Sequence, residues 1–148
     1  MYKMGEDGAS FAEFVEKIAA EAGLKVIKRS HTLVIVLFNM GEGRKQNVFV
    51  KPLGLDHKGN LVIGFSSPAL QMPADQLLSQ DVANDLLRKN TKFAHGSWGI
   101  ERQGENDYLV AFSTQLAHTM QPQEFEAIVR MLSRAADDME KKLGVDLF

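Results

Sequence analysis

Apolar residues recur at every third or fourth position in three segments of the chain, which is the spacing of one face of an α-helix. The pattern predicts helices over residues 10–22, 74–89 and 122–143. The third is the longest, and its apolar stripe runs for about six turns. The defining positions are Phe11, Phe14, Val15, Ile18 and Ala22 in the first segment, Leu78, Val82 and Leu86 in the second, and Phe125, Ile128, Val129, Leu132, Ala136, Met139 and Leu143 in the third.

Residues that commonly begin or end helices stand at the ends of two of these segments. Ser10 and Glu13 have the spacing of a capping box, in which the hydroxyl and the carboxylate each accept a hydrogen bond from a backbone N–H. Gly23 follows the first segment and suits a helix C-terminus. Pro122 suits the first position of the third helix, and Gly144 follows its last apolar residue.

Segments rich in β-branched and aromatic residues predict five strands. Three of them form a meander within residues 24–38, 47–53 and 61–65, and the turns between them contain glycine. The other two lie in the stretch "HGSWGIERQGENDYLVAF", residues 95–112. The polar segment "RQGEND" between them is typical of a hairpin turn.

The order of elements predicts the fold class. Residues 66–73 are expected to form a loop, because Pro68 and Pro73 are unfavourable in a central strand. The resulting order is α-β-β-β-α-β-β-α, an α+β fold with a mainly antiparallel five-stranded sheet packed by helices. Nothing in the sequence suggests a linker, so we expect residues 1–148 to form one domain, with residues 1–9 flexible.

The strand around Leu33–Phe38 is apolar at every position, which is expected when both faces of a sheet are covered. Three helices of this length cannot cover both faces of a five-stranded sheet, and a bare apolar face would be unusual for a monomer. We therefore expect a homodimer, because a self-complementary contact about a two-fold axis is the commonest arrangement. The residues predicted to form the interface are Leu78, Val82, Leu86 and Trp98.

Composition and charge narrow the function classes. The chain has 148 residues, no cysteine and a formal net charge of −2. The absence of cysteine excludes disulfides, thiol catalysis and cysteine metal sites. The basic clusters are small, at Arg44–Lys45 and Lys141–Lys142, so nucleic-acid binding is not expected. The N-terminal residues lack the apolar core of a signal peptide and the apolar runs are short, so we expect a cytoplasmic protein that does not bind a membrane.

No constellation with catalytic or metal-binding spacing is visible. His31, His57, His95 and His118 lie on different predicted strands and turns, and none has the i, i+4 spacing of a helical metal site. The glycines of "MGEGRK" lack the spacing of a phosphate-binding loop, and no GxSxG nucleophile motif occurs. We predict no catalytic residue, no metal and no cofactor, although catalytic sites assemble in space and an enzyme stays a possible alternative.

The order of elements resembles the type III secretion chaperone fold and the YbjN-type bacterial proteins related to it in architecture. The resemblance spans residues 10–143 and has no short diagnostic motif. It is carried by "SFAEFVEKIAAEAGL", "LVIVLF…NVFVKPL…GNLVIGF", "DQLLSQDVANDLLRKN", "WGIERQGENDYLVAF" and "PQEFEAIVRMLSRAADDMEKKL". It implies a small, usually dimeric cytoplasmic protein that keeps a segment of a partner protein soluble and catalyses no reaction.

If the chain is such a chaperone-like binding module, an extended partner segment should bind through apolar burial and strand addition rather than through charge. The predicted partner-binding positions are Phe11, Phe14, Ile18, Val48 and Val50. Each of them also fits a buried core. The alternative is a small enzyme or ligand-binding domain, for which a cavity with convergent polar groups would be the sign.

Overall fold

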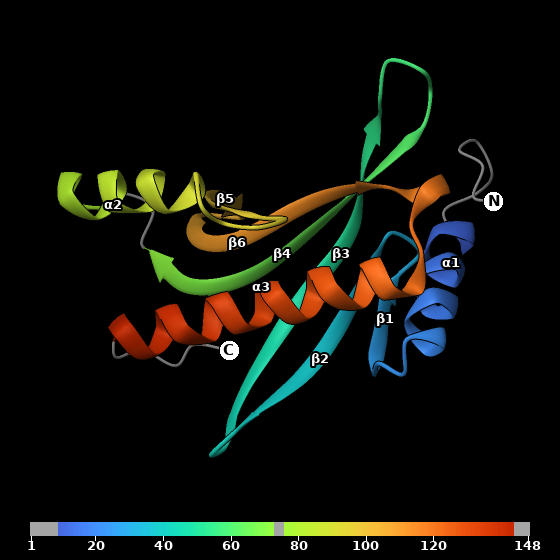
Figure 1. Ribbon diagram of the computed structural model, residues 1–148, viewed down its shortest axis with the longest axis horizontal. Helices are drawn as coiled ribbons and strands as arrows, with labels where there is room; N and C mark the ends of the chain where they lie inside the picture. Colours follow the sequence, from blue (N-terminus) through green and yellow to red (C-terminus); the bar gives the residue numbers. More distant parts are fainter. Residues whose placement is uncertain (1–8, 73–75, 144–148) are drawn as a thin grey trace.

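The computed structural model describes residues 9–72 and 76–143. Over these residues the chain forms three α-helices, one 3-10 turn and one antiparallel sheet of six strands (Figure 1). The helices are α1 (Ala9–Glu21), α2 (Gln80–Asn90) and α3 (Pro122–Leu143), and the 3-10 turn is η1 (Ala117–Thr119). The strands are β1 (Val26–Ser30), β2 (Leu33–Gly41), β3 (Arg44–Leu55), β4 (Leu61–Met72), β5 (Ser97–Gln103) and β6 (Asn106–Leu116).

The α+β class and the antiparallel sheet are confirmed, but the prediction of five strands is wrong. The sheet has six strands in the order β1-β2-β3-β4-β6-β5. The segment taken as one strand, residues 24–38, is two strands joined by a tight turn at His31 and Thr32. The Ser30 side-chain oxygen accepts a hydrogen bond from the Thr32 backbone N–H at 3.2 Å and stabilises that turn. The sequence signal for this turn is the run of five polar residues at positions 28–32.

The prediction of a loop at residues 66–73 is also wrong as far as Met72, because β4 continues to that residue. Pro68 is accommodated for two reasons. The ladder between β4 and β3 ends at the pair Phe49 and Ser66, so Pro68 pairs only with β6. The register with β6 also shifts between Pro68 and Leu70, and a bulge is a position where a strand tolerates proline. Pro73 lies outside the described residues.

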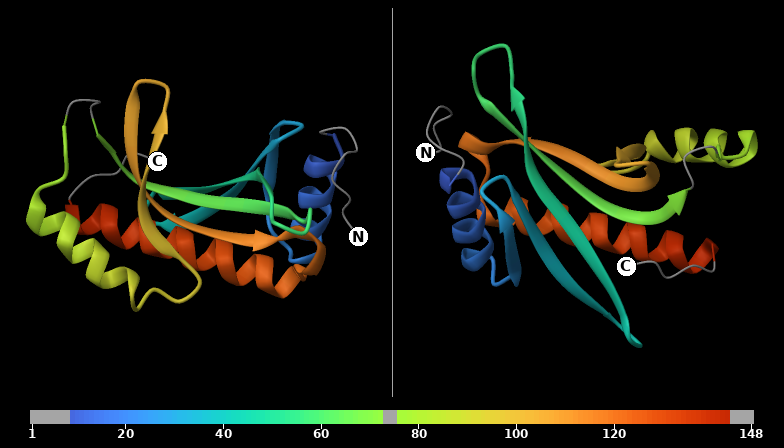
Figure 2. Two further views of the ribbon diagram at one scale, coloured as in Figure 1. Left: turned by 90° about the horizontal axis from the view of Figure 1, so that it is seen from above. Right: turned by 180° about the vertical axis from the view of Figure 1, so that it is seen from behind.

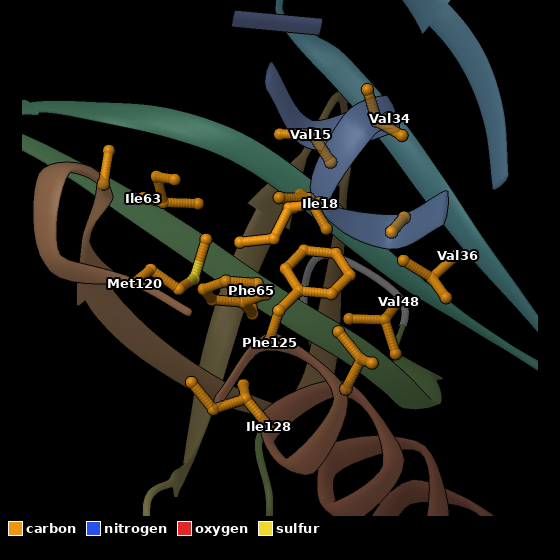
Figure 3. Close-up of a cluster of buried hydrophobic side chains, with 14 of the residues drawn as sticks. Val15, Ile18, Val34, Val36, Val48, Ile63, Phe65, Met120, Phe125 and Ile128 are labelled. Atoms are coloured by element: carbon orange, nitrogen blue, oxygen red, sulfur yellow. The ribbon is translucent and has the colours of Figure 1, made fainter. Parts of the chain in front are cut away.

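The helices pack on one face of the sheet. Residues of α1 and α3 meet inward-facing side chains of β2, β3 and β4 in the main core, which Figure 3 shows in close-up. Phe65 of β4 and Phe125 of α3 contact each other edge to face, with ring centroids 5.7 Å apart. Helix α2 lies at the other end of the sheet from α1 (Figure 2). There Leu86 joins Leu109 of β6 and Met139 of α3 in a second, smaller cluster.

No helix of the described residues packs on the opposite face of the sheet. The strands themselves protect part of this face, since Ile35 and Ser66 are buried. The sheet is bent enough for the Lys51 amino group on β3 to lie 3.6 Å from the Glu101 carboxylate on β5, although β4 and β6 lie between these two strands in the sheet order. Larger apolar side chains on the strands are exposed, among them Ile27, Leu53, Leu55 and Phe112.

The predicted ends of the three helices agree with the structure only in part. The bounds of α3 match the prediction, while Gly144 lies outside the described residues. The capping hydroxyl predicted at Ser10 falls outside the described side chains, and of the predicted flexible segment 1–9 only Ala9 is described. Helix α2 begins at Gln80 rather than at residue 74. The reason is Ser79, whose hydroxyl accepts the Val82 backbone N–H at 3.2 Å and caps the helix there.

Candidate functional site

The residues predicted to bind a partner segment lie in the core of the monomer. Phe11, Ile18, Val48 and Val50 are each at most 5% exposed, and Phe14 is partly buried against the same cluster. Burial of side chains of this size stabilises the fold by roughly 1.5–3 kcal/mol each. A partner segment therefore has no access to the four buried side chains in this structure.

Three of the four residues predicted to form a dimer interface line one cavity, while Val82 is exposed on α2 outside its lining. Leu78, Leu86 and Trp98 line a cavity of about 230 Å³ between α2 and β5. Apolar side chains around this cavity are exposed, notably Leu87 at 64% and Ile100 at 56%. We call this region the α2–β5 surface, and define it by its exposed or partly exposed apolar residues Leu77, Leu78, Val82, Leu87 and Ile100.

The α2–β5 surface is held in place by an amide side chain. The Asn90 Nδ2 group donates to the Trp98 carbonyl oxygen at 3.2 Å, and the Trp98 backbone N–H donates to Asn90 Oδ1 at 2.6 Å. This two-point contact ties the last residue of α2 to β5. The Trp98 ring contacts Phe93 edge to face, with ring centroids 5.9 Å apart. Val82, Leu87 and Ile100 of the surface therefore lie on a helix and a strand that are tied together, while Leu77 and Leu78 lie in the segment that leads into α2.

Two further properties of the α2–β5 surface favour protein binding. Strand β5 is at the edge of the sheet, so one side of its backbone has no strand partner among the described residues. Helix α2 carries Asp81 in its first turn and Arg88 and Lys89 in its last turn. Opposite charges at the two ends of one helix are the pattern that lets two copies of that helix pair antiparallel.

A second cavity, of about 320 Å³, lies on the other side of Trp98 between α2 and α3. We call it the α2–α3 cavity. Its apolar lining is Phe93, Trp98, Ala135 and Met139, and its charged lining is Lys89, Asp138 and Lys142. Asp85 lies between the two lysines, with its Oδ2 atom 3.0 Å from Lys89 Nζ and 3.9 Å from Lys142 Nζ.

The crowding of these lysines affects their protonation. Lys89 lowers the pKa of Lys142, first because its ammonium group donates a hydrogen bond to the neutral form of the Lys142 amine and then through its positive charge. The pKa of Lys89 is raised, first by the same contact and then by its hydrogen bond with Asp85. The pKa of Asp85 is in turn lowered, chiefly by its hydrogen bond with Lys89. One shared carboxylate thus serves two amino groups at the rim of an apolar cavity.

Buried polar groups connect the C-terminal half of α3 to the sheet. The Arg44 guanidinium binds Asp137 through two contacts, Nε to Oδ1 at 3.0 Å and Nη2 to Oδ2 at 3.2 Å. Gln46 Nε2 donates a hydrogen bond to Glu140 Oε1, and the Ser67 hydroxyl lies 3.2 Å from Gln46 Oε1. Sequence reasoning missed these contacts, since Arg44 and Gln46 are more than 90 positions from their partners. Both fix α3 on the sheet.

The histidines are not gathered into a site. Among residues 9–72 and 76–143, no group of three or more His, Asp or Glu side chains is placed to hold a metal ion. His95 has a left-handed backbone, with φ of 61°, and leads into β5. The stretch from residue 95 to 112 forms the predicted hairpin, and its turn contains Gly104 with φ of 62°. Its charges include an ion pair between Arg102 and Asp107 on paired strands.

No protein-family model matches the sequence, and no curated protein sequence matches it. In the part of the chain that the structure describes, no helix has the length and apolar character needed to cross a membrane.

Proposed function

We propose that this chain is a non-catalytic protein-binding module that pairs with a second copy of itself through the α2–β5 surface and holds an extended segment of another protein. The proposal follows the architectural resemblance to secretion chaperones and YbjN-type proteins. The observation that carries it is the α2–β5 surface, where apolar side chains stay exposed around a preformed cavity beside an open strand edge. Such surfaces mark sites of protein association.

A second copy is the occupant that the charges favour. A two-fold axis across α2 brings Asp81 of one copy near Arg88 of the other, twice over, while Leu87 and Ile100 of both copies lose contact with water. The compartment in this proposal is the cytoplasm, which the absence of cysteine from the sequence supports.

The extended segment of the partner protein belongs at the opposite edge of the sheet. Strand β1 is the other edge, and four of its five residues are exposed. An added strand there would satisfy the open backbone groups of β1 while α2 and β5 stay in the dimer contact. Affinity capture from a native lysate would supply the partner. Slower hydrogen exchange of the β1 amides in the resulting complex would support this binding mode, and unchanged exchange would contradict it.

Sedimentation equilibrium tests the dimer. At about 50 µM, above the dissociation constant of a typical weak dimer, the wild-type protein should sediment as a dimer. Leu87→Glu and Ile100→Glu should each sediment as monomers, because each places a charge in the proposed contact. Leu55→Glu is the matched control: Leu55 is 53% exposed but lies at the end of β3, and its replacement should leave the dimer intact. A wild-type monomer, or dimers of the Leu87 and Ile100 variants, would refute the proposal.

A further inference from the structure

The α2–α3 cavity has a combination of features that the protein-binding proposal does not use. Its lining is apolar over Phe93, Trp98, Ala135 and Met139, and two amino groups stand together at its rim. We propose that this cavity binds a small amphiphilic carboxylate, with the apolar body of the ligand on Phe93, Trp98 and Met139 and its carboxylate beside the amino groups of Lys89 and Lys142, on their cavity side.

The volume of the cavity sets the size of the ligand. At about 320 Å³ it lies at the lower end of the range of small-molecule sites, roughly 300–1,000 Å³. A medium-length alkyl chain or a single aromatic group fits such a volume, whereas a long fatty acid does not. The lining suits either, because aromatic faces and a methionine thioether adapt to flat and to flexible apolar groups.

The charges at the rim set the chemistry of the polar end. Lys89 and Lys142 share the single carboxylate of Asp85, at 3.0 and 3.9 Å. A ligand carboxylate would give the second amino group a counter-charge of its own. Asp138 also lines the rim and opposes an anion, while Arg134, one turn earlier in α3, lines the adjoining cavity together with Asp138.

The protonation of the lysines agrees with this assignment. The pKa of Lys142 is lowered because Lys89 lies against it, so an added anion would raise that pKa again.

The sole tryptophan makes the test direct, because Trp98 lines the cavity and its fluorescence reports on the ligand. Titration with octanoate should change Trp98 emission with saturation, and octanol, the neutral analogue, should bind at least about fivefold more weakly. Lys89→Gln and Lys142→Gln should each weaken octanoate binding by about fivefold and leave octanol binding unchanged. Lys58→Gln, in the exposed turn between β3 and β4, is the matched control and should bind both as wild type does.

A cavity-filling variant completes the test. Ala135→Leu should weaken binding of octanoate and octanol alike, because its side chain occupies the apolar floor. Trp98 also lines the cavity of the α2–β5 surface, so octanoate bound there would change its emission as well. Octanoate binding that the two lysine variants and Ala135→Leu leave unchanged would overturn the proposal, as would equal affinity for octanol. A monomeric protein refutes the dimer but not this site, because neither lysine belongs to the α2–β5 surface.

Discussion

Arg44 and Asp137, 93 positions apart in the chain, form a two-point ion pair that joins the start of β3 to α3. The Asp137 side chain is only 4% exposed, and the Arg44 side chain is 20% exposed. Lys141, one turn later in α3, adds a second positive charge 3.5 Å from Asp137 Oδ2. A carboxylate this deep is stable only while the cations remain beside it.

Replacing that carboxylate should therefore be costly. Asp137→Asn keeps the shape of the side chain but removes its charge, and we expect a loss of about 2–3 kcal/mol in the free energy of unfolding measured with urea. Glu126→Gln is the comparison, because the Arg130–Glu126 pair has the same Nε contact distance of 3.0 Å but is exposed on α3. Its loss should be below about 0.5 kcal/mol. Equal effects of the two substitutions would contradict the role assigned to Asp137.

The same pair predicts how stability depends on pH. Burial raises the pKa of Asp137, but the hydrogen bond and charge of Arg44, with the charge of Lys141, outweigh it and hold the pKa below the ordinary aspartate range. A carboxyl group whose pKa is depressed in the folded state stabilises the fold above its unfolded-state pKa of about 3.9 and loses that contribution as the pH falls through the folded-state value. The free energy of unfolding of the wild type, measured with urea, should therefore fall as the pH is lowered through this acidic range. The same decrease should be smaller in Asp137→Asn, which lacks the carboxyl group.

The hydrogen bonds around Gln46 form a second connection between α3 and the sheet. The Ser67 hydroxyl lies 2.9 Å from the Asn47 carbonyl oxygen and 3.2 Å from Gln46 Oε1, and both Gln46 and Glu140 are buried. Ser67→Ala should lower the free energy of unfolding by about 1–1.5 kcal/mol, since buried acceptors lose their donor. Ser30→Ala, at an exposed hydroxyl, should stay within about 0.5 kcal/mol of wild type.

A charge exchange tests the antiparallel pairing of α2 in the proposed dimer. Asp81→Lys and Arg88→Glu should each weaken the dimer by a few-fold, because each places like charges opposite one another. The double variant restores opposite charges and should dimerise nearly as well as the wild type. Sedimentation of all three variants and the wild type forms a complete double-mutant cycle. If the loss of dimer affinity in the double variant equals the sum of the two single losses, the antiparallel pairing of α2 is excluded.

Two glycines should differ in their tolerance of alanine. A Cβ atom at Gly96 would lie 2.9 Å from Phe93 Cε1 and 3.1 Å from Leu132 Cδ2, inside the packed region beside Trp98. At Gly64 the nearest atom would be Leu53 Cδ1 at 2.8 Å, but Leu53 is 52% exposed and can move. Gly96→Ala should cost about 1–3 kcal/mol of stability and change the near-ultraviolet signal of Trp98, while Gly64→Ala should cost less than about 1 kcal/mol.

Sequence patterns predicted the features of the fold that depend on interactions between residues close together in the chain. The apolar stripe over residues 122–143 gave the bounds of α3, because helical periodicity and a proline at the first position act within a few residues. The split between β1 and β2 depends on a turn made by Ser30 and Thr32, which a count of β-branched residues does not detect. The extension of β4 past Pro68 depends on where its ladder with β3 ends, a property of the assembled sheet.

The same distinction between local and long-range interactions applies to the candidate surfaces. The apolar character of Leu78, Val82, Leu86 and Trp98 predicts a common surface, and the structure brings Leu78, Leu86 and Trp98 together around one cavity. No local sequence pattern predicts that Lys89 and Lys142 share Asp85, or that Arg44 pairs with Asp137. These partners are brought together only by the packing of α3 on the sheet and on α2.

The position of α3 in the chain has a consequence for synthesis. The apolar residues of the sheet, such as Val48 and Phe65, obtain their cover from Phe125, Ile128 and Leu132 of α3. The ribosome makes these helical residues after all six strands, and its exit tunnel delays their release further. Until then the nascent sheet has no α3 to bury its inner face, so this protein should gain protection from proteases only after α3 has left the tunnel.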